Sequence, residues 1–153
     1  MSEVRSPAAS VPVGRLSVNA VTLTDASKLI CESALSGSGV AVHLINSYTV
    51  SLAEEDPEYA DCINGGWLRL ADGRPLQWLS ALRHDRQRLE QIRGADLMNR
   101  VLSDGRQHGL RHYLLGSTDR VLADLTTSVV RSFKGVEIVG SESPPFRELT
   151  AKE

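Results

Sequence analysis

Short apolar runs alternate along this chain with longer stretches in which apolar residues recur at helical spacing. The clearest run, residues 40–45, is apolar on both faces apart from His43, which is typical of a buried parallel strand. Further strands are predicted over residues 67–70, 111–115 and 136–140, where short apolar runs end at glycine or at polar turn residues. These four runs are the expected strands of one sheet.

Helical spacing dominates the stretches between these strands. Pro75 suits the first position of a helix, because its missing N–H costs nothing there, and the apolar residues that follow it are Leu76, Leu79 and Leu82. Asp56-Pro57 has the same form of a cap followed by a first-turn proline. The remaining helices are predicted after Thr24 or Asp25, through residues 50–53, from 94–96 to 102, and over 121–130.

The first 23 residues show a different pattern. Residues 15–23 alternate apolar and polar positions, which predicts a strand or an edge hairpin. Residues 1–14 lack periodicity and are expected to form a flexible arm. The alternation of strands and helices beyond them predicts parallel pairing with right-handed crossovers. We therefore expect a single α/β domain over residues 15–153, with a doubly wound, mostly parallel, Rossmann-like sheet and helices on both faces.

Composition narrows the classes of function. The 153-residue chain has a formal net charge of −2, which gives no electrostatic reason to propose nucleic acid as a partner. No apolar run approaches the roughly 20 residues that span a bilayer, and the N-terminus lacks the apolar core of a secretory signal, so we expect a cytoplasmic protein. Cys31 and Cys62 fall on predicted helices and are expected to be buried free thiols. The histidines show no metal-ligand spacing, and neither a metal nor a cofactor is expected.

Polar residues follow three of the predicted strands. Asn46 follows the first, Asp72-Gly73 the second, and Gly116-Ser117-Thr118 the third. Carboxyl ends of parallel strands meet at one edge of a sheet, where open α/β folds bind ligands, so we expect these turns to converge on one crevice. A Gly-Ser-Thr turn before a helix is also typical of anion sites. Each turn has a simpler interpretation as well, since Asp-Gly is a common turn pair and Ser or Thr caps helices in any protein.

Several segments, in this order and at these separations, resemble the WecB/TagA/CpsF family of bacterial glycosyltransferases. They are HLIN at residues 43–46, LADGRPLQW at 70–78, RGADLM at 93–98, YLLG at 113–116, and VEIVG at 136–140 leading to SPPF at 143–146. The resemblance covers residues 18–150, nearly the whole chain. It is carried by the order and spacing of the set rather than by any single motif.

The resemblance implies transfer of an N-acetylhexosamine-type sugar from a nucleotide-sugar donor, expected to be a UDP-sugar, to a lipid-linked saccharide acceptor. This step belongs to cell-surface polysaccharide synthesis, with peripheral contact at the inner face of the cell membrane. It inverts the anomeric carbon without an essential metal. By position, the general base falls on Asp72, and one positioned carboxylate suffices to take the acceptor's hydroxyl proton. The expected substrate-binding residues are Asn46, Gly73, Arg93, Gly116, Ser117 and Thr118.

The sequence departs from the family pattern at three points. Gln91 stands where the family usually has an arginine for the diphosphate, with Arg88 and Arg93 nearby as substitutes. Leu44 stands where a hydroxyl residue is common. Family members continue into a strand with a Gln-Glu motif and a C-terminal segment that meets the membrane, and residues 1–153 contain neither. We therefore expect a C-terminally truncated domain whose uncovered sheet edge favours a homo-oligomer.

Three interpretations remain at this point. The chain is an active glycosyltransferase, for which Asn46 and Asp72 argue. Alternatively, it is an inactive nucleotide-sugar-binding relic of that family, for which Gln91 argues. A flavodoxin-like or receiver-like signalling domain fits less well, because the strand before Asn46 does not end in an acidic residue.

Overall fold

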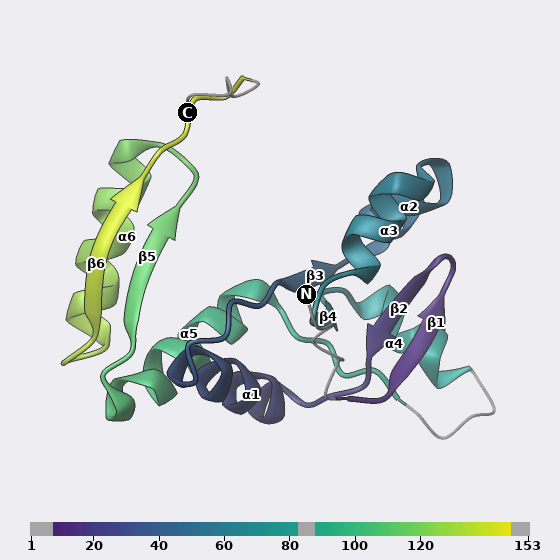
Figure 1. Ribbon diagram of the computed structural model, residues 1–153, viewed down its shortest axis with the longest axis horizontal. Helices are drawn as coiled ribbons and strands as arrows, with labels where there is room; N and C mark the ends of the chain where they lie inside the picture. Colours follow the sequence, from purple (N-terminus) through teal and green to yellow (C-terminus); the bar gives the residue numbers. More distant parts are fainter. Residues whose placement is uncertain (1–7, 83–87, 148–153) are drawn as a thin grey trace. The chain divides into compact units, whose positions relative to one another are not determined.

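A computed structural model describes residues 8–82 and 88–147, and the chain divides into two compact units of mixed α/β structure (Figure 1). Unit 1 is Met1–Val101 and unit 2 is Leu102–Glu153. The boundary falls within helix α5 (Gly94–Gly105). The described strands pair two by two, one pair antiparallel and two pairs parallel. A doubly wound sheet and a single domain over residues 15–153 stay predictions.

An antiparallel hairpin opens unit 1. Strand β1 (Ser10–Val13) pairs with β2 (Leu16–Asn19), and Gly14 allows the tight turn because its φ of 58° lies in the left-handed region. The expectation of a flexible arm is wrong for Ser10–Val13, since Val11 is only 1% exposed within the core. Residues 1–7 of that expected arm lie outside the described residues.

A parallel strand pair forms the centre of unit 1. Strand β3 (Val42–Ile45) pairs with β4 (Leu68–Ala71), and all four residues of β4 are buried. Ile45 and Ala71 belong to one hydrophobic cluster, which includes side chains of the hairpin and of helices α2 (Ser47–Glu55), α3 (Pro57–Asn64) and α4 (Arg74–Ala81). Leu68 and Leu70 belong to a second cluster with α1 (Leu23–Leu35) and α5. Side chains therefore cover both faces of this pair.

The helices begin where capping side chains are available. Thr22 caps α1, with its hydroxyl accepting from Asp25 N at 3.1 Å, so the cap lies earlier than the expected Thr24 or Asp25. Asp56 caps α3 ahead of Pro57, as predicted. Pro75 is the second residue of α4, one position later than predicted.

Arg69, in the middle of β4, ties the strand pair to the hairpin. Its backbone N–H donates to Asn19 Oδ1 at 2.8 Å. Its guanidinium donates to the carbonyls of Ser17, Asn64 and Gly66, the bond to Asn64 measuring 2.9 Å. Burial lowers the pKa of Arg69 by desolvation, yet an arginine in a protein stays charged. The sequence pattern did not single this residue out.

Both cysteines lie on helices and outside any disulfide, as predicted, but only one is buried. Cys31 on α1 is 5% exposed, whereas Cys62 on α3 lies at the surface. The predicted burial of Cys62 is therefore wrong, because helical periodicity alone did not identify the side of α3 that meets the core.

Unit 2 is a strand–helix–strand arrangement that follows the 3-10 turn η1 (Arg106–His108). Strand β5 (Arg111–Leu115) pairs in parallel with β6 (Glu137–Glu142), and helix α6 (Asp119–Ser132) connects them. These elements were predicted from the sequence. The His112 Nε2 atom is buried and has no hydrogen-bond partner within the described residues.

Candidate active site

Asn46 and Asp72 lie side by side at the carboxyl end of the β3–β4 pair. The last paired residues of the two strands are Ile45 and Ala71, and Asp72 N donates to Ile45 O at 2.7 Å. Neighbouring strands lie about 4.8 Å apart, so the next residue on each strand falls beside its counterpart. A Cβ built on Gly73 would lie 3.9 Å from Asn46 Cβ. The structure thus brings together two residues that are distant in the sequence.

Asn46 is already used as a helix cap. Its Oδ1 accepts from Thr49 N at 3.0 Å and from Thr49 Oγ1 at 3.2 Å, and its own N–H donates to Thr49 Oγ1 at 3.5 Å. This reciprocal capping box fixes the side chain at the start of α2. Its amide nitrogen makes no hydrogen bond to any residue that the structure describes, which leaves two N–H donors available to a ligand.

The carboxylate of Asp72 is half-buried, and it has neither an ion pair nor a hydrogen bond among the described residues. The helix that follows, α4, starts at Arg74 with Gly73 as its N-cap and without a side-chain cap. The positive end of that helix therefore lies next to the carboxylate. Such a carboxylate has free oxygens for accepting a proton, as a general base requires.

Arg93 follows a segment that runs along β4. Ile92 N donates to Ala71 O at 2.7 Å. Alternate residues of a strand bond to opposite neighbours, so this hydrogen bond lies on the edge of β4 that faces away from β3. Arg93 then accepts from Leu97 N at 3.0 Å through its carbonyl as α5 begins. Its guanidinium is exposed and pairs with Asp96, Nε to Oδ2, at 2.7 Å. Asn46, Asp72 and Arg93 therefore occupy turns at the same end of the strand pair.

Gly94 marks a close approach between α5 and β3. A Cβ at this position would lie 2.8 Å from Leu44 Cδ1. The missing side chain of Gly94, in the RGADLM segment, therefore leaves room for the side chain of Leu44. Gln91, which stands in the position of the expected arginine, is half-buried on the segment before this helix.

The Gly116-Ser117-Thr118 turn lies in unit 2. Gly116 has a φ of 113° and Ser117 a φ of 63°, which is rare for a residue with a side chain. Thr118 caps α6 by accepting from Val121 N at 3.4 Å. Ser117 O accepts from Ser143 Oγ at 2.6 Å, which ties the turn to the segment after β6. The convergence of this turn with Asn46 and Asp72 stays a prediction.

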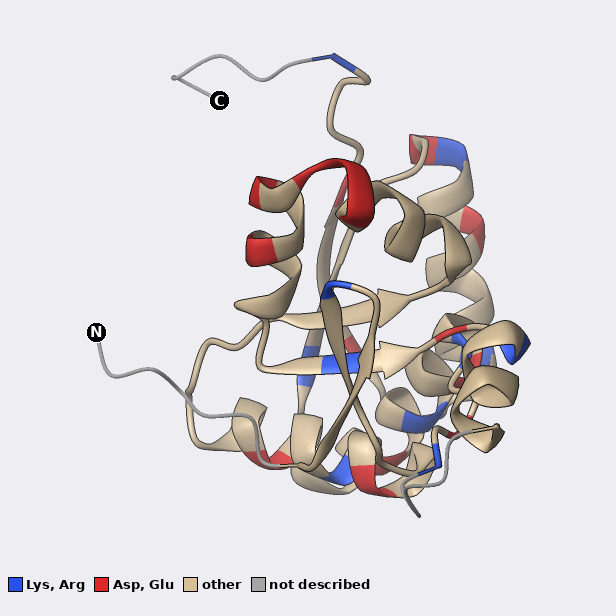
Figure 2. Ribbon diagram, turned by 90° about the vertical axis from the view of Figure 1, so that its right-hand side faces the viewer, with Lys and Arg blue, Asp and Glu red and all other residues tan. Residues whose placement is uncertain are grey.

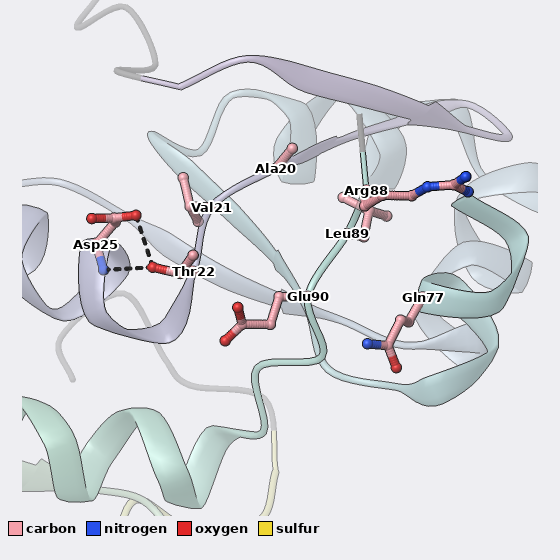
Figure 3. A pocket seen from close by; sticks show the side chains of 8 residues that line it. All are labelled: Ala20, Val21, Thr22, Asp25, Gln77, Arg88, Leu89 and Glu90. Carbon is pink, nitrogen blue, oxygen red and sulfur yellow. Dashed lines mark hydrogen bonds between the residues drawn. The ribbon is translucent and has the colours of Figure 1, made fainter. Parts of the chain in front are cut away.

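A cavity of about 380 Å³ lies in unit 1 between the start of α1, α4 and the segment after residue 87 (Figure 3). Its charged side chains already make structural bonds: Arg88 Nη1 donates to Ser80 O at 2.9 Å, and Glu90 Oε1 accepts from Leu23 N at 3.0 Å. None of the catalytic or substrate-binding residues expected from the sequence lines it. The lining residues are Ala20, Val21, Thr22, Asp25, Gln77, Arg88, Leu89 and Glu90.

Within residues 8–82 and 88–147, no group of three or more His, Cys, Asp or Glu side chains is placed to hold a metal ion. No described helix combines the length and the apolar character that crossing a membrane requires.

Comparison with protein-family models gives a match over nearly the whole chain. Residues 11–153 match the model described as the glycosyl transferase WecG/TagA/CpsF family. The match includes both strands that precede Asn46 and Asp72, the RGADLM segment and the turn at Gly116. The chain therefore belongs to the WecG/TagA/CpsF family of glycosyltransferases.

Proposed function

We propose that this chain transfers an N-acetylhexosamine-type sugar from a UDP-sugar to a lipid-linked saccharide acceptor at the inner face of the cell membrane. The family supports glycosyl transfer in general. The particular donor, the acceptor, the inversion and the membrane location are our proposal. A doubly wound, Rossmann-like arrangement is part of it.

In the proposed reaction, Asp72 accepts the proton of the acceptor hydroxyl as that oxygen bonds to the anomeric carbon. The bond from this carbon to the diphosphate breaks on the opposite side, so the configuration inverts. Asn46 donates from its amide nitrogen to the donor sugar while its oxygen remains on Thr49. Arg93 and the Gly116-Ser117-Thr118 turn offer positive charge, N–H groups and hydroxyls to the leaving diphosphate.

The observation that carries this proposal is the juxtaposition of Asn46 and Asp72 at the carboxyl end of β3 and β4. The amide donor and the carboxylate, which has no partner among the described residues, stand at adjacent positions. Such a pair is required of a group that holds a substrate and a group that deprotonates it.

One observation favours a second candidate, an inactive nucleotide-sugar-binding protein. Gln91 lacks the charge that the leaving diphosphate requires, and Arg93 is partly neutralised by Asp96.

Titration calorimetry with UDP-N-acetylhexosamines and with free UDP tests donor binding directly. We expect heat of binding and a rise in melting temperature, because a ligand that binds only the native state stabilises it by mass action. If no UDP-sugar gives heat or a melting shift at millimolar concentration, both candidates are wrong. Donor binding without transfer to any saccharide acceptor, even in the presence of lipid, selects the inactive candidate.

A further inference from the structure

The cavity of about 380 Å³ in unit 1 offers polar groups that the proposed reaction does not use. Figure 3 shows Asp25 and Glu90 on the side of the cavity nearest α1, and Gln77 on the side formed by α4. The cavity volume falls within the range of about 300–1,000 Å³ that is typical of small-molecule sites, which suits a ligand of one or two sugar rings.

The cavity keeps hydrogen-bonding groups that its structural bonds do not occupy. Glu90 Oε1 accepts from Leu23 N at 3.0 Å, whereas the second oxygen of Glu90 makes no hydrogen bond to any residue that the structure describes. Asp25 Oδ2 accepts from the Thr22 hydroxyl at 2.7 Å, which leaves Asp25 Oδ1 without a partner among the described residues. The side-chain amide of Gln77 makes no hydrogen bond within residues 8–82 and 88–147. A ligand with several O–H donors therefore finds acceptors here.

The charge of the lining selects among ligands. Asp25 and Glu90 carry two negative charges and Arg88 one positive charge, so the lining as a whole is negative. The Arg88 guanidinium already donates to Ser80 O at 2.9 Å, and it extends toward α4 and away from the two carboxylates (Figure 3). Such a lining repels a nucleoside diphosphate. It suits a neutral saccharide, because hydroxyl groups donate strongly to carboxylates and the apolar Val21 can meet C–H groups of a sugar ring.

Both walls of the cavity connect to the turn that carries Asp72. Helix α4 begins two residues after Asp72, and at about 1.5 Å per residue Gln77 lies roughly 6 Å along the helix axis from the N-cap. On the other wall, Glu90 lies two residues before Ile92, whose N–H donates to the carbonyl of the last residue of β4 at 2.7 Å. The cavity is therefore next to the proposed general base.

We propose that this cavity binds the saccharide of the acceptor and directs its reactive hydroxyl toward Asp72. Glu90 and Asp25 accept hydrogen bonds from ring hydroxyls, Gln77 contributes its amide, and Val21 packs against C–H groups. The role of the bound saccharide as acceptor rests on the proposed function, whereas saccharide binding in the cavity does not.

NMR titration of the full chain tests the cavity without donor or lipid. The probes are the methyl glycosides of glucose, galactose, mannose and N-acetylglucosamine, each added up to tens of millimolar. We expect at least one of them to shift the backbone amide signals of Val21, Thr22 and Glu90 in a saturable manner. No saturable shift with any glycoside, or shifts confined to Asn46 and Asp72, would overturn the proposal.

Two substitutions remove ligand contacts and keep the structural bonds. Gln77→Leu removes the amide, and Glu90→Gln removes the charge while an oxygen remains for Leu23 N. Each should raise the Kd of the tightest-binding glycoside about fivefold, the effect of one lost hydrogen bond, and the double variant should raise it further. A double variant that binds the glycoside like the wild type would exclude the cavity as its site.

The matched controls are Glu55→Gln and Gln107→Leu. Glu55 belongs to the acidic turn between α2 and α3, residues 54–58, and does not line the cavity (Figure 2). Gln107 lies on η1 in unit 2. Both controls should bind the glycoside like the wild type, and a control that weakens binding as much as its counterpart would overturn the assignment.

Two further probes identify a different occupant. If spermidine shifts the cavity signals and no glycoside does, the carboxylates hold an organic cation. If free UDP shifts them, the cavity belongs to the donor. Either result would overturn the proposal.

The two proposals fail separately. Titration with UDP-sugar alone reports on the donor site, and titration with glycosides alone reports on the cavity. A chain that binds UDP-sugar but no glycoside overturns the saccharide site alone. A chain that binds a glycoside in the cavity but no UDP-sugar overturns the proposed function, and with it only the role of that saccharide as acceptor.

Discussion

Asn46 is assigned both a structural and a substrate-binding role, and two substitutions separate them. Its Oδ1 caps α2 through Thr49 N at 3.0 Å and Thr49 Oγ1 at 3.2 Å, whereas its amide nitrogen is the group proposed to hold substrate. Asn46→Ala removes both groups. Asn46→Ser keeps an oxygen in capping position and removes the amide nitrogen.

The expected magnitudes follow from these contacts. Replacing a capping asparagine by alanine costs about 1 kcal/mol of stability, whereas serine caps nearly as well and should cost only a few tenths. Loss of one substrate hydrogen bond costs about 1 kcal/mol of transition-state stabilisation, or roughly fivefold in kcat/KM, and this loss should be the same in both variants.

Urea unfolding and initial rates of sugar transfer check the two parts. We expect the free energy of unfolding to fall in Asn46→Ala only, and kcat/KM to fall in both variants. Equal stability of all three proteins would refute the capping role. A wild-type rate for Asn46→Ser would refute the substrate role, whatever the alanine variant does.

Three further predictions concern the scaffold. Arg69→Met should lower the free energy of unfolding in urea by about 2–4 kcal/mol, because one buried and two part-buried carbonyls lose their donor. Arg93→Met at the surface should change it by less than about 1 kcal/mol, and equal effects would contradict the structural role of Arg69. Gly73 has a φ of −163° and a Cβ there would stand 3.5 Å from Pro75 Cδ, so Gly73→Ala should cost only the few tenths of a kcal/mol, roughly, by which alanine is the poorer N-cap. Gly94→Ala should cost more, about 1–2 kcal/mol, because its Cβ would lie 2.8 Å from a leucine methyl group. Burial lowers the pKa of His112, so its contribution to stability is present above the unfolded pKa of about 6.5 and is lost as pH falls through the folded pKa. His112→Leu should flatten this part of the profile of unfolding free energy against pH. An unchanged profile would show that His112 is not the cause of the pH dependence.

Local signals predicted the edge of the sheet that holds the candidate site. Asn46 and Asp72 each follow a short apolar strand, and parallel strands place their carboxyl ends together, so the juxtaposition was accessible from the sequence. The start of α3, with Asp56 as its cap and Pro57 as its first residue, was also predicted from neighbouring residues alone. The capping box between Asn46 and Thr49 adds a structural role that the analysis of the sequence did not assign.

Features that depend on distant contacts were not predictable in the same way. Strand β1 exists because Ser10–Val13 pairs with β2, although Pro12 interrupts its pattern. Arg69 lies between two leucines, and its burial depends on carbonyls from β2 and from the end of α3. Helical spacing identified α4 but not its buried side. The Ser80 hydroxyl can be buried because it accepts a hydrogen bond from Leu89 N, a contact that the spacing of apolar residues does not reveal.

The central claim is that Asp72 is the general base of a sugar transfer, and the rate of Asp72→Asn tests it most directly. The variant should fold and bind UDP-sugar like the wild type, because asparagine suits the same turn. Its kcat should fall by about 10²–10⁴-fold, the usual contribution of general-base catalysis. A folded, donor-binding Asp72→Asn variant that transfers sugar at the wild-type rate would contradict the account.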